Sequence, residues 1–352
     1  MTPNFWSGRR VLLTGHTGFK GSWLSLWLAG LGARVGGIAL PESDHSLWSI
    51  VRDCGVESHL LDIRNAESVR EAVARFQPEI LIHMAAQSLV RVSYRDPLAT
   101  FATNVMGTAN VLQACRDQPD LAAIVIVTSD KVYENHGEGR PFREDDRLGG
   151  HDPYSNSKAC TELVTQSFRD SFFAAGPPIA TARAGNVVGG GDWAEDRIIP
   201  DCVRALDSGI PVRLRYPDAV RPWQHVLEPL GGYLSLAEAL VDRPGETPSA
   251  VNFGPDPRSF CTVREVVESL GRHFNGRPGW EPDPGAHPPE ATALTLGSDL
   301  ALRSLAWRPR LDLEATMAWT AEWYRAHRSG QDMLAFSRAQ IRRYQELGGA
   351  KS

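Results

Sequence analysis

Lysine is scarce in this chain of 352 residues. Only four of the 37 basic residues are lysine, namely Lys20, Lys131, Lys158 and Lys351, and the rest are arginine. Arginine stays charged at any physiological pH, whereas the surroundings of a lysine ammonium can shift its pKa. Three of the four lysines fall inside the motifs described below, which indicates that those positions need a compact cation with a tunable pKa.

Cysteines and long apolar runs are also few. The five cysteines are scattered, and no pair has C-x-x-C spacing, so neither a disulfide framework nor a zinc site is expected. The longest apolar run, 121–127, is too short to cross a bilayer, and the first ten residues lack the apolar stretch of a signal peptide. A net charge of −5 gives no basic excess for nucleic acid. We therefore expect a cytoplasmic protein that binds no membrane, nucleic acid or metal.

Strand and helix patterns alternate in the first half of the chain. Continuous apolar runs at 10–14, 34–40, 79–83 and 122–127 are typical of strands that are covered on both faces. Helical spacing appears at 22–31 and 68–76. This alternation predicts an α/β fold with a doubly wound, mostly parallel sheet of Rossmann type.

After Asn186 the pattern changes, because prolines become frequent and the alternation loses its regularity. Residues 263–274 and 313–327 still have the spacing of amphipathic helices. We expect residues 1–186 to bind a dinucleotide. Residues 187–352 are expected to form mainly a smaller α+β part that binds the substrate, with some segments returning to the first domain.

A glycine-rich segment, Thr14-Gly-His-Thr-Gly-Phe-Lys-Gly21, lies between the first predicted strand and the first predicted helix. Glycine permits a tight turn and lets the backbone approach a pyrophosphate at the helix N-terminus. The plainer alternative is an ordinary strand-to-helix turn. Lys20 is expected either near the phosphates or in solvent. The residues predicted to bind the dinucleotide here are Gly15, Thr17, Gly18, Phe19, Lys20 and Gly21.

NAD is favoured over NADP. No arginine follows the second predicted strand, where a 2′-phosphate would need one, and Glu42 or Asp44 either meets the ribose or is an exposed loop acid. Asp62 and Ile63 follow a short apolar segment, so Asp62 either accepts from the adenine amino group or closes a loop. The strand end at 83–87 contains Ala85, Ala86 and Gln87, which suits close approach to a flat cofactor or simply tight packing.

Polar residues end the predicted strand 122–127. Thr128, Ser129, Asp130 and Lys131 emerge at the carboxyl edge of the sheet, where ligands bind in open α/β folds. Downstream, Tyr154 and Lys158 stand four residues apart on a predicted helix and so share one face. An ammonium beside a phenol favours the phenolate, which takes a proton from a hydroxyl near neutral pH. The plain alternatives are a helix-surface pair for Tyr154 and Lys158, and a strand-end ion pair for Asp130 and Lys131.

Together these motifs resemble the extended short-chain dehydrogenase/reductases over nearly the whole chain. Ser129-Asp130-Lys131 is similar to the nucleotide-sugar 4,6-dehydratase branch, which carries a hydroxyl residue, Asp, and then Glu or Lys. The 4-epimerases instead carry a pair of serines and small residues at this strand end. Lysine at the third position resembles the dehydratases of CDP-glucose, whereas glutamate resembles those of TDP-glucose. The stretches 15–23, 84–87, 185–193 and 221–225 resemble the same CDP-glucose branch.

The resemblance implies an enzyme that holds NAD and dehydrates CDP-glucose to CDP-4-keto-6-deoxyglucose. It implies that Tyr154, helped by Lys158 and Ser129, takes the 4-hydroxyl proton. Lys131 would then take the C5 proton and Asp130 would protonate the leaving 6-hydroxyl. These roles require a lowered pKa for Lys131 and a raised pKa for Asp130. The resemblance also implies a homodimer formed through paired helices, or a higher homo-oligomer.

Substrate contacts are expected beyond residue 185. Asn186 follows the mostly apolar segment 179–184, at a predicted sheet edge, and His225 lies in the stretch 221–225 that resembles the CDP-glucose branch. Arg197, Arg215 and Arg221 are candidates to clamp a diphosphate, since a guanidinium fork suits phosphate oxygens, although each is otherwise a surface cation. Three other functions stay open: dehydration of TDP-glucose or GDP-mannose, 4-epimerisation, which needs no C5 base, and non-catalytic NAD(H) sensing.

Overall fold

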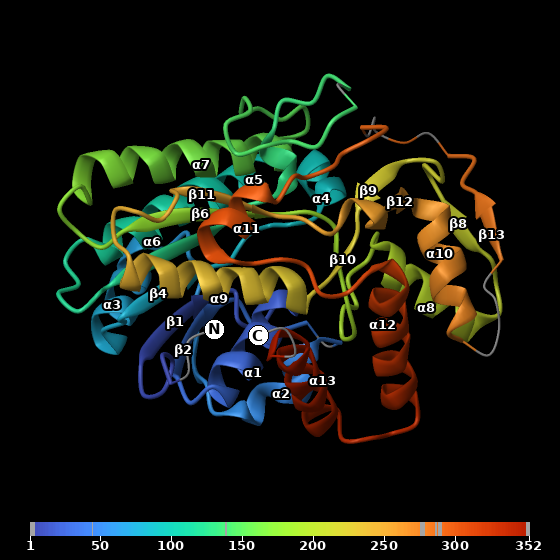
Figure 1. The fold of residues 1–352 in the computed structure, drawn as a ribbon, viewed down its shortest axis with the longest axis horizontal. Coiled ribbons are helices and arrows are strands. Elements are labelled where there is room, and N and C mark those ends of the chain that lie inside the picture. Colours follow the sequence, from blue (N-terminus) through green and yellow to red (C-terminus); the bar gives the residue numbers. More distant parts are fainter. Residues whose placement is uncertain are drawn as a thin grey trace.

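The computed structural model describes residues 4–43, 45–137, 139–274, 279–285, 287 and 291–349; Asp44, one of the two acids considered for the ribose, lies outside them. At the centre is a seven-stranded sheet in which every pairing is parallel, with the strand order β11-β6-β5-β4-β1-β2-β3 (Figure 1). The predicted doubly wound parallel fold is confirmed. Its strands are β1 (Arg10–Thr14), β2 (Arg34–Ala39), β3 (Glu57–Leu60), β4 (Ile80–His83), β5 (Ala123–Val127), β6 (Ile179–Ala184) and β11 (Ala250–Phe253).

Helices cover both faces of this sheet. On one face, α3 (Ala66–Phe76), α6 (Gly107–Cys115) and α7 (Pro153–Phe172) enclose an apolar core to which the strands contribute Leu12 and Ile124. On the other face, α1 (Phe19–Gly30) and α9 (Leu227–Asp242) pack over Leu13 and Val125, and α13 (Met333–Gly349) lies against α1. Successive residues of a strand point to opposite faces, so a strand buried on both sides needs the continuous apolar runs seen in the sequence.

Helix α1 begins at Phe19, three residues before the predicted start at 22. Gly18 is its N-cap, and Gly21 lies inside its first turn. A Cβ on Gly21 would stand 2.0 Å from the carbonyl oxygen of Gly15, so only glycine fits where the helix passes over the preceding turn. The sequence pattern placed the start too late because glycine is a weak helix former and here is kept for this close approach.

Beyond residue 186, short elements form a lobe that Figure 1 shows at one end of the sheet, together with α12 (Leu313–Arg328). Strand β11 and helices α9 and α13 also come from this half but belong to the layers of the central sheet. The division into a dinucleotide-binding and a substrate-binding domain stays a prediction. The elements of the lobe are β7 (Val187–Val188) with β10 (Gln224–His225), β8 (Val212–Leu214) with β13 (Trp280–Pro282), β9 (Val220–Pro222) with β12 (Phe260–Thr262), α8 (Ile198–Ser208) and α10 (Val263–Arg272).

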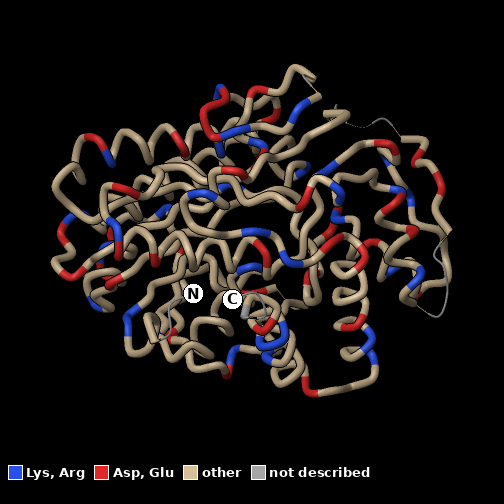
Figure 2. Tube along the Cα trace, viewed as in Figure 1, with Lys and Arg blue, Asp and Glu red and all other residues tan. Residues whose placement is uncertain are grey.

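The remaining elements are short connections. They are α2 (Leu47–Val51), α4 (Val90–Arg95), α5 (Pro97–Phe101), the π-helical η2 (Ala102–Met106), α11 (Asp299–Leu305), and the 3₁₀ turns η1 (Arg52–Cys54), η3 (Asp130–Val132) and η4 (Pro257–Ser259). Across the described ranges, no helix has both the length and the apolar character needed to cross a membrane. Basic and acidic residues are interspersed along the described part of the trace in Figure 2. A cytoplasmic location stays a prediction.

Candidate active site

A cavity of about 1900 Å³ opens at the carboxyl edge of the sheet, between the strand ends and the lobe. The turn before α1 and the ends of β4, β5 and β6 form one wall, and residues 191–221 form much of the other. The structure therefore brings together residues that are far apart in the sequence. All of the predicted site residues line this cavity except Gln87, Lys158 and His225.

The glycine turn is shaped to hold a pyrophosphate. Gly15 has a φ of 78°, and a Cβ there would lie 2.8 Å from the backbone nitrogen of Ala85. Helix α1 has Gly18 as its N-cap, with no side-chain cap and no acidic residue in its first turn. The first N–H groups of a helix have no partner within it, so this turn offers hydrogen-bond donors and the positive end of the helix dipole to an anion.

Asp62 and Ile63 line the part of the cavity that also contains the glycine turn, which we call the cofactor cleft. Asp62 accepts hydrogen bonds from the backbone nitrogen of Arg64 at 2.9 Å and from its Nε at 2.8 Å, and these bonds lower the pKa of Asp62. Glu42, predicted as a possible ribose ligand, stands outside the cavity lining and forms an ion pair with Arg52 at 3.8 Å. Asp62 therefore lies at the cleft as a carboxylate, and Glu42 does not reach it.

Gln87 lies outside the cavity lining and holds the loop after β4 through hydrogen bonds. Its backbone nitrogen donates to Asn104 Oδ1 at 2.8 Å, and its side chain donates to Thr100 at 2.9 Å. Asn104 in turn donates to the carbonyl oxygen of Gln87 at 3.0 Å and to Ser157 Oγ at 2.8 Å. Asn104 was not among the predicted residues, because a lone asparagine between two helical segments carries no local signal of this role. It joins the loop after β4 to the helix that carries Tyr154.

Ser129 organises the strand-end residues. As the N-cap of η3, its Oγ accepts from the backbone nitrogen of Lys131 at 3.2 Å, and it donates to Asp130 Oδ1 at 3.1 Å. Asp130 is buried, and its Oδ2 has no hydrogen-bond partner within the described part of the chain. Burial raises the pKa of Asp130, opposed by the nearby Lys131. This direction agrees with the protonated acid that the resemblance requires.

Tyr154 lies in the first turn of α7, whose start is fixed by the Asp152 side chain accepting from the backbone nitrogen of Ser155 at 2.9 Å. Burial raises the pKa of Tyr154 to about 12, while its hydrogen bond with Ser129 acts in the opposite direction. The Tyr-x-x-x-Lys spacing predicted a lowered pKa. The structure gives the reverse because loss of hydration outweighs the charges around the phenol.

Lys158 lies directly behind the catalytic edge. Its Nζ donates to the carbonyl oxygen of Val127 at 3.0 Å, and burial lowers its pKa to about 8, opposed by Glu162. Glu162 itself forms a buried two-pronged ion pair with Arg183, with N–O distances of 2.9 and 2.8 Å. Thr128 also donates to Glu162, so the strand end and α7 share one buried polar network.

Lys20 is half-buried and lines the cavity. Its Nζ donates to the hydroxyl of Tyr233 on α9 at 3.2 Å. Burial, followed by the charges of Lys158 and Arg197, lowers its pKa to about 7. Of the two alternatives for Lys20, a fully solvated side chain does not hold, because the side chain is half-buried against Tyr233 of α9. A role near the phosphates stays a prediction.

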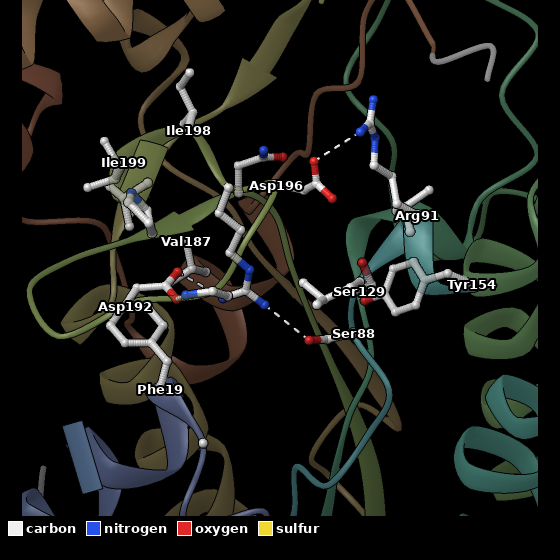
Figure 3. Close-up of a pocket in the computed structure, with 18 of the residues that line it drawn as sticks. Phe19, Ser88, Arg91, Ser129, Tyr154, Val187, Asp192, Asp196, Ile198 and Ile199 are labelled. Atoms are coloured by element: carbon white, nitrogen blue, oxygen red, sulfur yellow. Dashed lines mark hydrogen bonds and ion pairs between the residues drawn. The ribbon is translucent and has the colours of Figure 1, made fainter. Parts of the chain in front are cut away.

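The predicted substrate residues are distributed over the lobe side of the cavity. Asn186 lines the cavity, and Arg197 spans it by donating to Asp192 at 2.9 Å and to Ser88 at 3.0 Å, a link drawn in Figure 3. Arg215 pairs with Asp196 at 2.9 Å. Arg221 is buried near enough to Asp130 to lower the pKa of that carboxyl.

His225 is not brought to the cavity. It is fully buried, with its ring centroid 6.4 Å from that of Trp23 and 5.8 Å from that of Trp319. The backbone nitrogen of Leu227 donates a hydrogen bond to His225 Nδ1 at 3.3 Å. The predicted contact of His225 with substrate is therefore not supported, because its strand β10 directs the ring into the apolar core.

This geometry fits a group of proteins found by comparison. Residues 11–252 match the NAD dependent epimerase/dehydratase family. The chain belongs to this family. The NAD dependence of the family agrees with the predicted cofactor, and the glycine turn described above fits its pyrophosphate.

One relative in the NAD dependent epimerase/dehydratase family is particularly similar over its whole length. The CDP-glucose 4,6-dehydratase of Salmonella typhimurium is 46% identical over 349 residues, which cover 97% of each chain. A dTDP-glucose 4,6-dehydratase of Xanthomonas campestris is 26% identical over 89% of this chain and 92% of its own. The relatives thus include 4,6-dehydratases of nucleotide sugars with different bases.

Solved structures of the family share the fold. A Thermus thermophilus UDP-glucose 4-epimerase in complex with NAD superposes with a TM-score of 0.77 at 26% identity, covering 90% of this chain and 99% of the other. The Bacillus anthracis dTDP-glucose 4,6-dehydratase in complex with NAD has a TM-score of 0.77 at 21% identity, covering 92% and 99%. Epimerases and dehydratases therefore use this fold alike, and residues of the site must separate them.

Proposed function

We propose that this enzyme converts CDP-glucose to CDP-4-keto-6-deoxyglucose and water. The observation that carries the proposal is the buried Asp130 beside Tyr154. Burial raises the pKa of Asp130, and its Oδ2 accepts no hydrogen bond from the residues that the structure describes, as suits an acid that donates a proton. An epimerase has no need for such an acid. The 46% identity to the Salmonella typhimurium CDP-glucose 4,6-dehydratase supports the choice of CDP-glucose.

The first step removes the proton of the sugar 4-hydroxyl. NAD, held on the glycine turn from Gly15 to Gly21, would supply the hydride acceptor and donor for C4 and C6 and a positive ring charge that favours the phenolate. Tyr154 takes the hydroxyl proton, and its hydrogen bond with Ser129 holds the phenol in position. Lys158, anchored to the carbonyl oxygen of Val127, adds positive charge behind the phenol. The product of this step is a 4-keto sugar, whose C5 hydrogen is acidic.

The second step eliminates water across C5 and C6. Lys131 takes the C5 proton, the electron pair forms the C5–C6 double bond, and the C6–O bond breaks. Asp130 gives its proton to the leaving oxygen, so water departs. When hydride returns to C6, the proton held by Lys131 returns to C5.

One proton remains to be moved before the next turnover, because Tyr154 has gained one and Asp130 has lost one. Ser129 lies between them: it is hydrogen-bonded to Tyr154 and donates to Asp130 Oδ1 at 3.1 Å. Its hydroxyl can pass the proton from the phenol to the carboxylate. This transfer restores both groups without a solvent proton.

The test is incubation of the purified protein and NAD with CDP-glucose, TDP-glucose, UDP-glucose and GDP-mannose in separate reactions. Mass spectrometry measures the loss of water, and alkali treatment reveals the absorbance of a 4-keto-6-deoxy sugar. Dehydration of CDP-glucose in preference to the others is the expected result. Dehydration of another sugar would change the nucleotide, and a C4 epimer without loss of water would overturn the dehydratase proposal.

We also propose that the enzyme is a homodimer formed through α5, η2 and α7. Leu98 on α5, Met106 on η2 and Leu163 on α7 are exposed to 80%, 58% and 54%, and α7 contacts both other elements. Such exposed apolar side chains on adjoining helices favour burial against a second copy. Light scattering should give twice the chain mass for the native protein and the chain mass for Leu98→Glu with Leu163→Glu. Leu302→Glu, on an exposed site of α11, is the matched control.

A further inference from the structure

Most of the arginines that line the cavity form ion pairs with carboxylates. A cavity that accepts a dinucleotide and a nucleotide sugar must hold two diphosphates, so positive charge is required there. Yet the arginines of the lobe wall are already paired with acids of the same lining. Examples are Arg197 with Asp192, Arg204 with Asp201 and Arg213 with Glu281. A phosphate that uses these arginines must compete with the protein's own carboxylates.

Asp196 differs from the other acids because one oxygen bridges two walls. Its Oδ1 lies 3.1 Å from Arg91 Nη1 and 2.9 Å from Arg215 Nη1. Arg91 belongs to α4, beside the sheet, and Arg215 follows β8 in the lobe. Figure 3 shows Asp196 and Arg91 facing each other over the cavity, with the ion pair drawn between them. An anionic oxygen held by two guanidiniums is the arrangement that a phosphate oxygen takes up.

The backbone of Asp196 supports the view that this position is specialised. Its φ is 61°, in the left-handed region that non-glycine residues rarely adopt. Such outliers persist where surrounding interactions hold them, and they cluster at ligand sites. Here the two ion pairs hold the carboxylate over the cavity. Asparagine and aspartate are the residues that tolerate this conformation best, so the carboxylate can be removed without disturbing the backbone.

We propose that Asp196 is an internal competitor that occupies a diphosphate subsite made by Arg91 and Arg215, and that it sets nucleotide affinity by being displaced. This inference rests on the proposed function in assigning the diphosphate to a nucleotide sugar. A nucleotide diphosphate must break the two ion pairs of Asp196 before its phosphate can bind the same arginines. The affinity of the protein for the nucleotide is therefore moderate. Release of the product is helped in turn, because the carboxylate returns to the arginines as the diphosphate leaves.

The test is calorimetric titration of the NAD-loaded protein with CDP, comparing Asp196→Asn with the native chain. The amide keeps the shape but not the charge, so the dissociation constant for CDP should fall by about five-fold, the order expected for loss of two partly exposed ion pairs. High salt should bring the dissociation constants of Asp196→Asn and the native chain closer together, because screening weakens both the ion pairs and the phosphate contacts. The matched control is Asp218→Asn, which removes an exposed carboxylate paired with Arg264 outside the cavity lining and should change CDP affinity less than about two-fold.

Weaker or unchanged CDP binding in Asp196→Asn would overturn the proposal and make Asp196 a residue that holds the two arginines in place. The same comparison with dTDP and UDP separates this inference from the proposed function. If the native chain binds dTDP more tightly than CDP, the assignment of CDP-glucose fails. The role of Asp196 is then decided by comparing the dissociation constants of Asp196→Asn and the native chain for dTDP. If neither protein binds any of the three nucleotides, the competitor proposal fails as well.

Discussion

The Nζ of Lys158 donates a hydrogen bond to the carbonyl oxygen of Val127 at 3.0 Å. Val127 is the last residue of β5, so this bond fixes the lysine of α7 immediately behind Ser129, Asp130 and Lys131. The bond also keeps the ammonium out of water, and burial lowers its pKa to about 8. In the proposed mechanism, Lys158, held by the carbonyl oxygen of Val127, supplies positive charge to the site while Tyr154 carries the proton.

Replacing Tyr154 with phenylalanine removes the proton acceptor and leaves the ring. We expect kcat for CDP-glucose to fall by about 10²–10⁴-fold, the contribution of a general base. Single-turnover formation of NADH should slow equally, because hydride leaves C4 only as the hydroxyl proton is taken. Thermal melting of Tyr154→Phe checks that the fold is intact. A kcat within about ten-fold of the native value would contradict the role of Tyr154.

Changing Asp130 or Lys131 should separate oxidation from loss of water. Asp130→Asn keeps the buried shape but has no proton to donate, and Lys131→Ala has no base for C5. In each variant, mixing with CDP-glucose should produce NADH that persists, with dehydration slowed by about 10²–10⁴-fold. Stopped-flow absorbance of NADH and mass spectrometry of the sugar measure the two steps. If NADH formation is lost as completely as in Tyr154→Phe, neither residue acts only in the elimination.

The buried pair of Glu162 and Arg183 should govern stability. Both side chains are only 4% exposed, so Glu162→Gln leaves a buried guanidinium without its counter-charge and should lower the free energy of unfolding by about 3–5 kcal/mol. The measurement is urea denaturation. The exposed pair Arg343 with Glu322 offers the control, since Glu322→Gln should change the same quantity by less than about 1 kcal/mol. Equal effects of the two substitutions would show that burial of the inner pair does not matter.

Glu228 should make stability fall as pH rises. This buried carboxyl accepts from the Tyr344 hydroxyl at 2.6 Å, and burial raises its pKa to about 7 from an ordinary value of 4.5. The folded protein then holds the proton more tightly than the unfolded chain. Stability from this group is full below about pH 4.5 and is lost by about pH 7, a change of roughly 3 kcal/mol.

The corresponding measurement follows the melting temperature of the native protein and of Glu228→Gln between about pH 5 and about pH 8. The amide cannot ionise, so the native protein should lose stability relative to the variant across this range. Glu346→Gln, exposed on α13, should show no such relative change. Parallel curves for the native protein and Glu228→Gln would mean that the carboxyl stays charged throughout.

Local patterns were sufficient for the sheet and for the cofactor turn. The apolar runs that became β1, β4 and β5 must be continuous because both faces of the sheet are covered by helices. The glycines at 15 and 21 were recognisable from their spacing between a predicted strand and a predicted helix, and the structure shows that a Cβ at either position would clash with backbone atoms. Patterns failed where a side chain's direction mattered, as for His225, which shares its stretch with Arg221 but points into the core.

The sequence by itself determined the parallel α/β fold and the dinucleotide turn, because each rests on neighbours along the chain and on residue chemistry. The same local patterns predict the catalytic groups. Only the tertiary structure decided which carboxyl is buried enough to keep a proton, which lysine faces Tyr233, and that Asp196 bridges Arg91 and Arg215. The contacts of Lys20 with Tyr233 and of Arg91 with Asp196 join segments more than a hundred residues apart. No local spacing encodes them, since they exist only once the sheet and the lobe have closed around the cavity.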